Sequence, residues 1–162
     1  MTGPVTLWRI GVDTPDYTAD DTTGAGAKIT GGRWNRKGNA VLYTSTSIAL
    51  ACLETVVHMK SGGLPLNRYL VRVDVPEEAW NARTVLAPAV GWDALPEGKV
   101  SLDAGDAWIS GAASPILLVP SVIVPEEPNV LVNPAHALSA GIKATKVRKW
   151  LYDPRLLGHK PL

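Results

Sequence analysis

The sequence RYLVRVDV, from Arg68 to Val75, decides the class of fold. Its odd-numbered positions hold Tyr69 and three valines, whereas its even-numbered positions are polar or charged apart from Leu70. Alternation with a period of two is typical of a β-strand that buries one face, and Pro76 ends the run. The core of this protein is therefore expected to be built on a β-sheet.

Working outward from this strand, shorter apolar runs predict further strands. The first is expected at residues 5–10, with Trp8 and Ile10 on one face and Leu7 and Arg9 on the other. Three more runs lie at residues 40–44, 116–124 and 130–132, the second of them divided by Pro120 into strands at 116–119 and 121–124. A final edge strand is expected at residues 146–152, stopped by Asp153-Pro154.

Helical signals are fewer. Residues 48–60 form an apolar segment that follows Ser45, Thr46 and Ser47, any of which can cap a helix, and Gly62-Gly63 would end it. Residues 11–30 predict a loop or lid, and residues 77–113 predict no more than a short helix or turn near 106–109. Because strands outnumber helices without a βαβ rhythm, the expected class is α+β, a single domain with a mixed or antiparallel sheet core and flanking helices.

Size and composition fit one domain over residues 1–162. The 162 residues are 46% hydrophobic and 19% charged, which suffices for a core, and the net charge of +1 argues against a large nucleic-acid footprint. The single Cys52 cannot form an internal disulfide and suits a reducing compartment. Because no signal peptide or membrane span is recognised, a cytoplasmic protein without membrane contact is expected.

Several common site patterns do not fit. Gly24-Ala25-Gly26 resembles the start of a dinucleotide fingerprint, but Ile29 stands where the third glycine should be. The three histidines lie at no metal-ligand spacing from one another or from Cys52, so no metal is expected. Ser121 lacks the glycines of a nucleophile elbow, which argues against a serine hydrolase.

The segment from Gly31 to Glu54 holds polar residues that a core does not need. Arg33 follows two glycines, Tyr43 comes at the end of a strand, and Glu54 is embedded in the apolar helical segment. Three of the four residues three or four positions from Glu54 are apolar; they are Leu50, Ala51 and Val57, with His58 the fourth. This carboxylate is expected to point into protein or a cleft, while a surface pair between Glu54 and His58 is the alternative.

Motifs spread over nearly the whole chain extend this set. They are Trp8-Arg9, Gly32-Arg33-Trp34-Asn35, Leu42-Tyr43-Thr44-Ser45, Glu54-Thr55-Val56-Val57-His58, Gly105-Asp106-Ala107-Trp108, Val119-Pro120-Ser121, Ile123-Val124-Pro125-Glu126-Glu127, Asn133-Pro134-Ala135-His136 and Asp153-Pro154-Arg155. In this order they resemble the RES-domain family, the toxins of RES–Xre type II toxin–antitoxin pairs. The resemblance implies a fold similar to ADP-ribosyltransferases and a toxin that destroys NAD+ by phosphorolysis or hydrolysis of the bond to nicotinamide. It also implies an Xre-type helix-turn-helix antitoxin that blocks the NAD+ site and brings any DNA contact.

The resemblance and the residue chemistry assign roles that agree. Arg9 and Arg33 suit the two phosphates of NAD+, because a guanidinium makes paired charge-assisted hydrogen bonds, although an arginine next to a tryptophan is often a surface stack. Tyr43 can stack on nicotinamide, or it can be a core tyrosine. Glu54 can stabilise the positive charge that develops on the ribose. The resemblance has Ser121 contacting the nicotinamide-side ribose or amide and placing Glu54, whereas a backbone hydrogen bond is its alternative.

Three functions remain open from the sequence. The leading expectation is NAD+ degradation, with water or orthophosphate as acceptor. A protein ADP-ribosyltransferase would use the same NAD+ site with a protein acceptor. A domain without catalysis that only binds an antitoxin or a nucleotide is the third. The basic residues Lys143, Lys146, Arg148 and Lys149 are most simply a solvated face.

Overall fold

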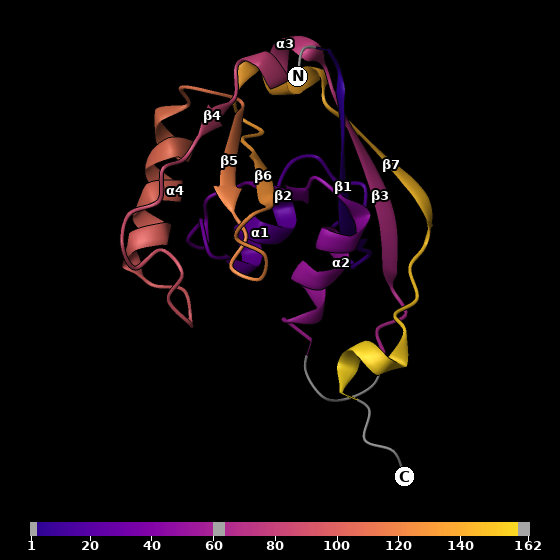
Figure 1. The fold of residues 1–162 in the computed structure, drawn as a ribbon. Helices are drawn as coiled ribbons and strands as arrows, with labels where there is room; N and C mark the ends of the chain where they lie inside the picture. Colours follow the sequence, from indigo (N-terminus) through magenta and orange to yellow (C-terminus); the bar gives the residue numbers. More distant parts are fainter. Residues whose placement is uncertain (1–2, 60–63, 159–162) are drawn as a thin grey trace.

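Strand β3 (Arg68–Val75) forms over the predicted residues and lies in a seven-stranded sheet (Figure 1). In this computed structural model, which describes residues 3–59 and 64–158, the strand order is β4-β5-β6-β2-β1-β3-β7. The other strands are β1 (Val5–Val12), β2 (Leu42–Ser45), β4 (Thr84–Val85), β5 (Ile116–Pro120), β6 (Pro128–Val132) and β7 (Lys143–Lys149). Only β4 and β5 pair in parallel among these strands, so the α+β class with a mixed sheet is confirmed.

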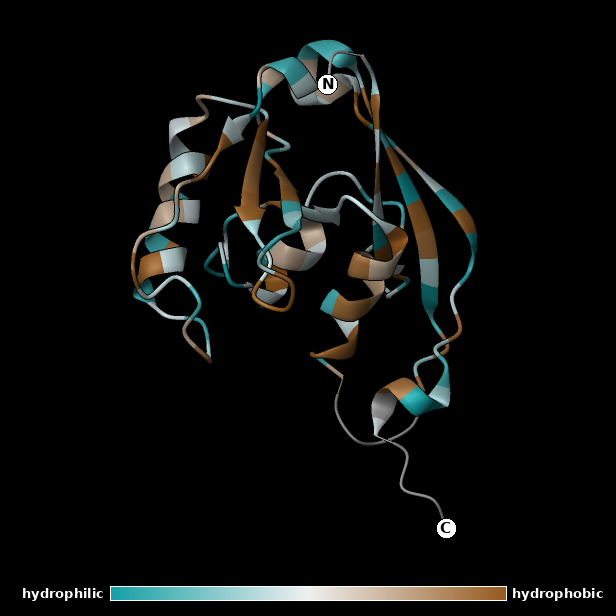
Figure 2. Cartoon of the chain, viewed as in Figure 1, coloured by the Kyte–Doolittle hydropathy of each residue, from teal (hydrophilic) through white to brown (hydrophobic). Residues whose placement is uncertain are grey.

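The helices are short and surround the sheet. They are α1 (Ala25–Thr30), α2 (Ile48–Val56), α3 (Glu77–Asn81) and α4 (Lys99–Gly111), with 3-10 helices η1 (Ala137–Gly141) and η2 (Pro154–Leu157). Hydrophobic residues concentrate on β3, β5 and α2, as Figure 2 shows. Within the described ranges, no helix has the length and apolar character that crossing a bilayer requires.

Several sequence expectations about local structure are wrong. The expected loop at 11–30 contains α1, and α4 begins at Lys99 rather than near residue 106. Residues 121–124 form a turn instead of a strand, because the Ser121 hydroxyl accepts hydrogen bonds from two of the backbone N–H groups that follow it. The final edge strand covers Lys143–Lys149 instead of 146–152. Helix α2 ends at Val56, and the Gly62-Gly63 stop lies outside the described residues.

The sheet opens between β1 and β2. These strands share a single paired position, Trp8 with Ser45, whereas β1 pairs with β3 along its whole length. Helix α2 packs on the face of β1 that carries Trp8 and Ile10, and the cluster around Leu7 fills the opposite face. Helix α2 follows β2 directly and contacts both β1 and β2, so it lies where these two strands share their one pair.

Candidate functional site

Helix α2 sets the position of Glu54. The Ser47 hydroxyl caps the helix by accepting a hydrogen bond from the Leu50 N–H at 3.1 Å, as expected for a serine before an apolar segment. Glu54 is half-buried, and its Oε1 accepts hydrogen bonds from the Ser121 hydroxyl at 2.7 Å and from the Asn129 amide at 2.6 Å. The alternative pair with His58 does not form, since the helix ends before that residue and Glu54 is engaged elsewhere.

The Ser121 hydroxyl uses both its donor and its acceptor capacity. The hydroxyl accepts from the N–H groups of Ile123 and Val124, each at 3.1 Å, so its only proton is directed at Glu54. The side chain is completely buried, at the point where Pro120 ends β5. The predicted proximity of Ser121 and Glu54 is therefore present, and the turn that follows β5 fixes it.

Two residues of this cluster were missed by the sequence reasoning. Asn129 lies on β6, and the Ser45 hydroxyl of β2 donates to its Oδ1 at 2.7 Å. The two residues face each other in the β2–β6 ladder. The available signal was an asparagine directly before the apolar run Val130-Leu131-Val132, because asparagine is uncommon in strands and needs partners when it is enclosed.

Tyr43 lies two residues before Ser45, so both side chains project from the same face of β2 about 6.7 Å apart along the strand. Its hydroxyl donates to Asn35 Oδ1 at 2.6 Å and accepts from the Trp34 N–H at 3.0 Å. Burial raises the pKa of Tyr43 well above its ordinary value, and the Trp34 N–H opposes this rise only in part. The ring is half-buried, and the hydroxyl braces the turn that carries Arg33.

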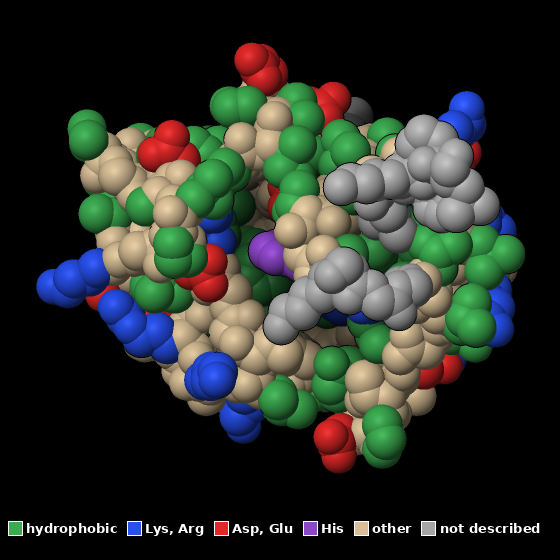
Figure 3. Space-filling model, turned by 90° about the horizontal axis from the view of Figure 1, so that it is seen from below, with side chains coloured by type: hydrophobic (Ala, Val, Ile, Leu, Met, Phe, Trp, Pro, Cys, Tyr) green, Lys and Arg blue, Asp and Glu red, His purple; other side chains and the backbone are tan. Residues whose placement is uncertain are grey.

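Arg33 is held by the loop before α4. Its Nη1 donates to the Trp92 carbonyl at 3.0 Å and to the Ala94 carbonyl at 2.9 Å. Trp34 is buried and stacks on Trp92 with ring centroids 6.1 Å apart, so it does not serve as a surface partner for the arginine. Seen from below, the surface is hollowed near its centre, with basic and histidine side chains at the hollow (Figure 3).

Arg9 is placed differently from the other expected site residues. By strand alternation its side chain leaves β1 on the Leu7 side, and Asp21 and Tyr17 act on it electrostatically. Desolvation lowers the pKa of Arg9, and the negative charge of Asp21 opposes this effect. Its Nε is buried and has no hydrogen-bond partner among the described residues. The structure thus brings Glu54 and Ser121 into direct contact and joins Tyr43 to the turn that carries Arg33, whereas Arg9 lies on the other face of β1.

The chain matches one known protein family over most of its length. A family model described as the RES domain matches residues 6–154. The chain belongs to the RES family. The expected resemblance is confirmed, and the match spans both halves of the sheet from β1 to the start of η2.

Curated relatives of this RES domain carry toxin names. A protein from Sphingobium sp. (strain YBL2) named "Prs ADP-ribosylating toxin" is 60% identical over 154 residues, which cover 93% of this chain and 96% of the relative. A "Toxin Res" from Yersinia enterocolitica is 33% identical, with 86% of this chain and 93% of that protein covered. Another "Toxin Res", from Photorhabdus laumondii, is 35% identical, with 89% and 93% covered.

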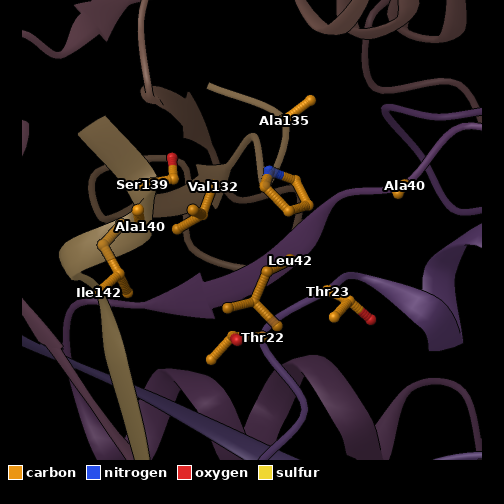
Figure 4. A pocket seen from close by; sticks show the side chains of 10 residues that line it. Thr22, Thr23, Ala40, Leu42, Val132, Ala135, Ser139, Ala140 and Ile142 are labelled. Carbon is orange, nitrogen blue, oxygen red and sulfur yellow. The ribbon is translucent and has the colours of Figure 1, made fainter. Parts of the chain in front are cut away.

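A cavity of about 410 Å³ lies on the face of the RES-domain sheet that carries Leu42 and Val132 (Figure 4), and by strand alternation Tyr43 leaves β2 on the opposite face. Leu42 and Val132 form its floor, and Thr22, Thr23 and Ile142 are among the residues at its walls. Its lining holds no ionisable side chain, whereas the hydrogen-bonded carboxylate lies on the other face. This cavity is therefore separate from the hydrogen-bonded cluster of Glu54, Ser121 and Asn129.

Proposed function

We propose that this RES protein is a toxin that cleaves the nicotinamide–ribose bond of NAD+ and transfers the ADP-ribosyl group to a protein. The observation that carries the proposal is the hydrogen bonding of the Glu54 carboxylate. Both of its hydrogen bonds end on Oε1, Oε2 has no hydrogen-bond partner among the described residues, and the residue is half-buried. A carboxylate with one oxygen anchored and the other without a protein partner can accept hydrogen bonds from ribose hydroxyls.

The reaction fits what such a carboxylate supplies. The bond between ribose C1′ and the nicotinamide nitrogen breaks, its electron pair leaves with neutral nicotinamide, and positive charge spreads over the ribose ring. A negative group beside that ring stabilises the oxocarbenium-like transition state more than the ground state. The acceptor then bonds to C1′ and loses its proton. No general acid is required, because the leaving group departs without charge.

Arg33 suits the pyrophosphate of NAD+. Arg33 uses only Nη1 for the two loop carbonyls among its described contacts, so its remaining N–H groups can reach a phosphate oxygen. Arg9 leaves β1 on the opposite face, so the proposal assigns the pyrophosphate contact to Arg33 and gives Arg9 no contact with NAD+ in this arrangement. Tyr43 contributes its ring as a stacking surface, since its hydroxyl is engaged with Asn35 and Trp34.

We choose a protein as the acceptor because of the name of the relative from Sphingobium. Its name describes ADP-ribosylation of Prs, and at 60% identity over nearly both full lengths it favours a protein acceptor for this chain. We therefore place protein transfer ahead of the degradation expected from the sequence, in which water or orthophosphate accepts the ADP-ribose. Because relatives are named toxins, we also propose a cytoplasmic setting and neutralisation by an Xre-type helix-turn-helix antitoxin that blocks the NAD+ site.

The substitution Glu54→Gln tests the proposal. It keeps the size of the side chain and removes the charge, so nicotinamide release from NAD+ should fall by about 10²–10³-fold while thermal unfolding stays close to that of the wild type. The exposed Glu78→Gln on α3 is the matched control and should retain wild-type activity. Full activity in Glu54→Gln would show that another group stabilises the transition state.

The acceptor is identified with labelled NAD+ offered alone, with orthophosphate, and with a cell lysate that contains Prs. Label that accumulates in a protein band at the mass of Prs supports protein transfer. Free ADP-ribose, or its 1-phosphate only when orthophosphate is present, would establish hydrolysis or phosphorolysis instead. No nicotinamide release under any of these conditions would favour the non-catalytic domain.

A further inference from the structure

We propose that Asn129 is a positioning residue: its side-chain amide, oriented by Ser45, holds the Glu54 carboxylate so that Oε2 is presented to the substrate. The inference rests on the proposed function and deepens it, because it explains how the carboxylate keeps one orientation. Asn129 does not touch the site of bond cleavage and acts through Glu54.

The two donors to Glu54 come from different elements. Ser121 reaches Oε1 from the turn after β5, and Asn129 reaches the same oxygen from β6. The terminal torsion of a glutamate side chain is broad, so a single hydrogen bond would leave the carboxylate free to rotate about Oε1. A second donor from another direction confines Oε1 and thereby the direction of Oε2.

The orientation of the Asn129 amide follows from its neighbours. An ionised carboxylate only accepts hydrogen bonds, so the group that meets Glu54 must be the amide nitrogen. The oxygen then faces Ser45, whose hydroxyl donates to it at 2.7 Å. Ser45 therefore fixes the amide in the rotation that points an N–H at Glu54.

The backbone gives this chain of hydrogen bonds a rigid base. Ser45 and Asn129 are directly paired on adjacent strands, and α2 begins three residues after Ser45. Ser45 is also the residue that pairs with Trp8, at the only paired position between β1 and β2 in the described residues. The anchor of the amide thus coincides with the point where the two parts of the sheet join.

The first test compares Asn129→Leu with Asn81→Leu, the same change at an exposed asparagine on α3. Leucine is similar in size to asparagine but cannot donate to Glu54. The expected result is a fall in kcat for nicotinamide release of about tenfold to a hundredfold with little change in NAD+ affinity, measured by calorimetry. The Asn81 variant should match the wild type.

Ser45→Ala should lower kcat less than Asn129→Leu, since the Asn129 amide then loses only the hydrogen bond that orients it.

The second test uses Asn129→Asp, which changes one atom and should preserve packing. Two carboxyl groups at this distance share a proton when one is available, and the protonated new group can donate to Glu54 as the amide does. When that proton is lost, the two groups repel each other. Activity of this variant should therefore fall from mildly acidic to mildly alkaline pH more steeply than that of the wild type. The wild type and Asn81→Leu, measured over the same range, correct for the ionisable groups of the flanking segments: His58 after α2, and Glu126 and Glu127 before β6.

The two hypotheses fail in different ways. If the wild type releases nicotinamide and Asn129→Leu does so at the same rate, the positioning role is overturned and the proposed function stands. If Asn129→Leu loses activity only in proportion to lost folded protein, and Asn129→Asp follows the wild-type pH profile, Asn129 is structural and the inference is overturned. If the wild type neither releases nicotinamide nor labels protein, the proposed function is wrong, and the positioning role of Asn129 is wrong as well.

Discussion

At the residue scale, hydrogen-bond partners explain why polar side chains are enclosed at this site. Asn35 is fully buried; it donates to the Ala27 and Asn39 carbonyls and accepts from the Tyr43 hydroxyl. Tyr43 in turn accepts from the Trp34 N–H, which lies next to Arg33. Each of these groups would cost free energy if its partner were removed, because water cannot replace the partner inside the fold. The hydrogen bonds of the Tyr43 hydroxyl therefore stabilise the turn that presents Arg33.

The substitution Tyr43→Phe tests this brace. It leaves Asn35 Oδ1 buried without a donor and the Trp34 N–H without an acceptor, so the free energy of unfolding should fall by about 1–3 kcal/mol. Urea unfolding measures this change, and the Michaelis constant for NAD+ should rise because Arg33 is less fixed. Tyr69→Phe is the control, since the hydroxyl of this tyrosine makes no hydrogen bond among the described residues and Lys146 lies over its ring. Equal unfolding midpoints for the two variants would contradict the brace.

At the element scale, α4 supports the Arg33 turn from the other side. Asp106 of α4 accepts hydrogen bonds from the Arg36 N–H and from the Asn39 amide, which tie the helix to the turn at 36–39. Gly105 lies against the backbone of Trp34, and a Cβ at this position would penetrate the Trp34 carbonyl oxygen. The glycine is required by this close approach and not by its backbone conformation, because its φ is that of an ordinary helix.

Two glycines of α4 provide a matched pair of substitutions. Gly105→Ala must push the helix away from the turn, so it should destabilise the fold by about 1–3 kcal/mol and weaken NAD+ binding through Arg33. Gly111→Ala places its Cβ in open space and should stabilise the protein by about 0.4–1 kcal/mol. Thermal unfolding of the two variants measures both effects. A Gly105→Ala protein as stable as Gly111→Ala would show that α4 can move without cost.

At the scale of the whole molecule, an ion pair links the segment after β1 to the edge strand β7, on the other side of β3. Asp13, just after β1, lies 2.9 Å from the Lys146 Nζ of the edge strand β7, and its carboxylate also accepts from the Ala19 N–H at 2.7 Å. The Lys146 ammonium and this N–H lower the pKa of Asp13, and the carboxylate raises the pKa of Lys146. The pair is partly exposed, so its effect on stability is expected to be small and sensitive to salt.

The direction of the pH dependence follows from the shift of Asp13. A carboxyl group whose pKa is lower in the folded state adds stability above the pKa it has when unfolded, and this contribution is lost as the pH falls through its folded value. The stability difference between the wild type and Asp13→Asn should therefore shrink on acidification below about pH 4. Chemical denaturation across this range measures it, with the exposed Asp16→Asn as control. A difference that is constant with pH would refute the linkage.

Part of the fold and site could be predicted because it depends on short-range patterns. The alternation at Arg68–Val75 and the capping of α2 by Ser47 are such patterns, and both are present. The helix within residues 11–30 and the early start of α4 were missed, since neither has a capping side chain and both begin after a glycine. The strand expected at 121–124 failed because the Ser121 hydroxyl competes for the backbone N–H groups that a ladder would need.

The sequence alone determined the family and the class of fold, and it supplied the short set of polar residues that we propose for NAD+, because motifs and hydrophobic periodicity are local properties. Only the tertiary structure decided which of these residues meet. Strand pairing brings Asn129 to Ser45 and the turn after β5 brings Ser121 to Glu54, across separations in sequence that no local pattern encodes. Strand alternation likewise sends Arg9 to the opposite face, because neighbouring side chains on a strand leave it in opposite directions.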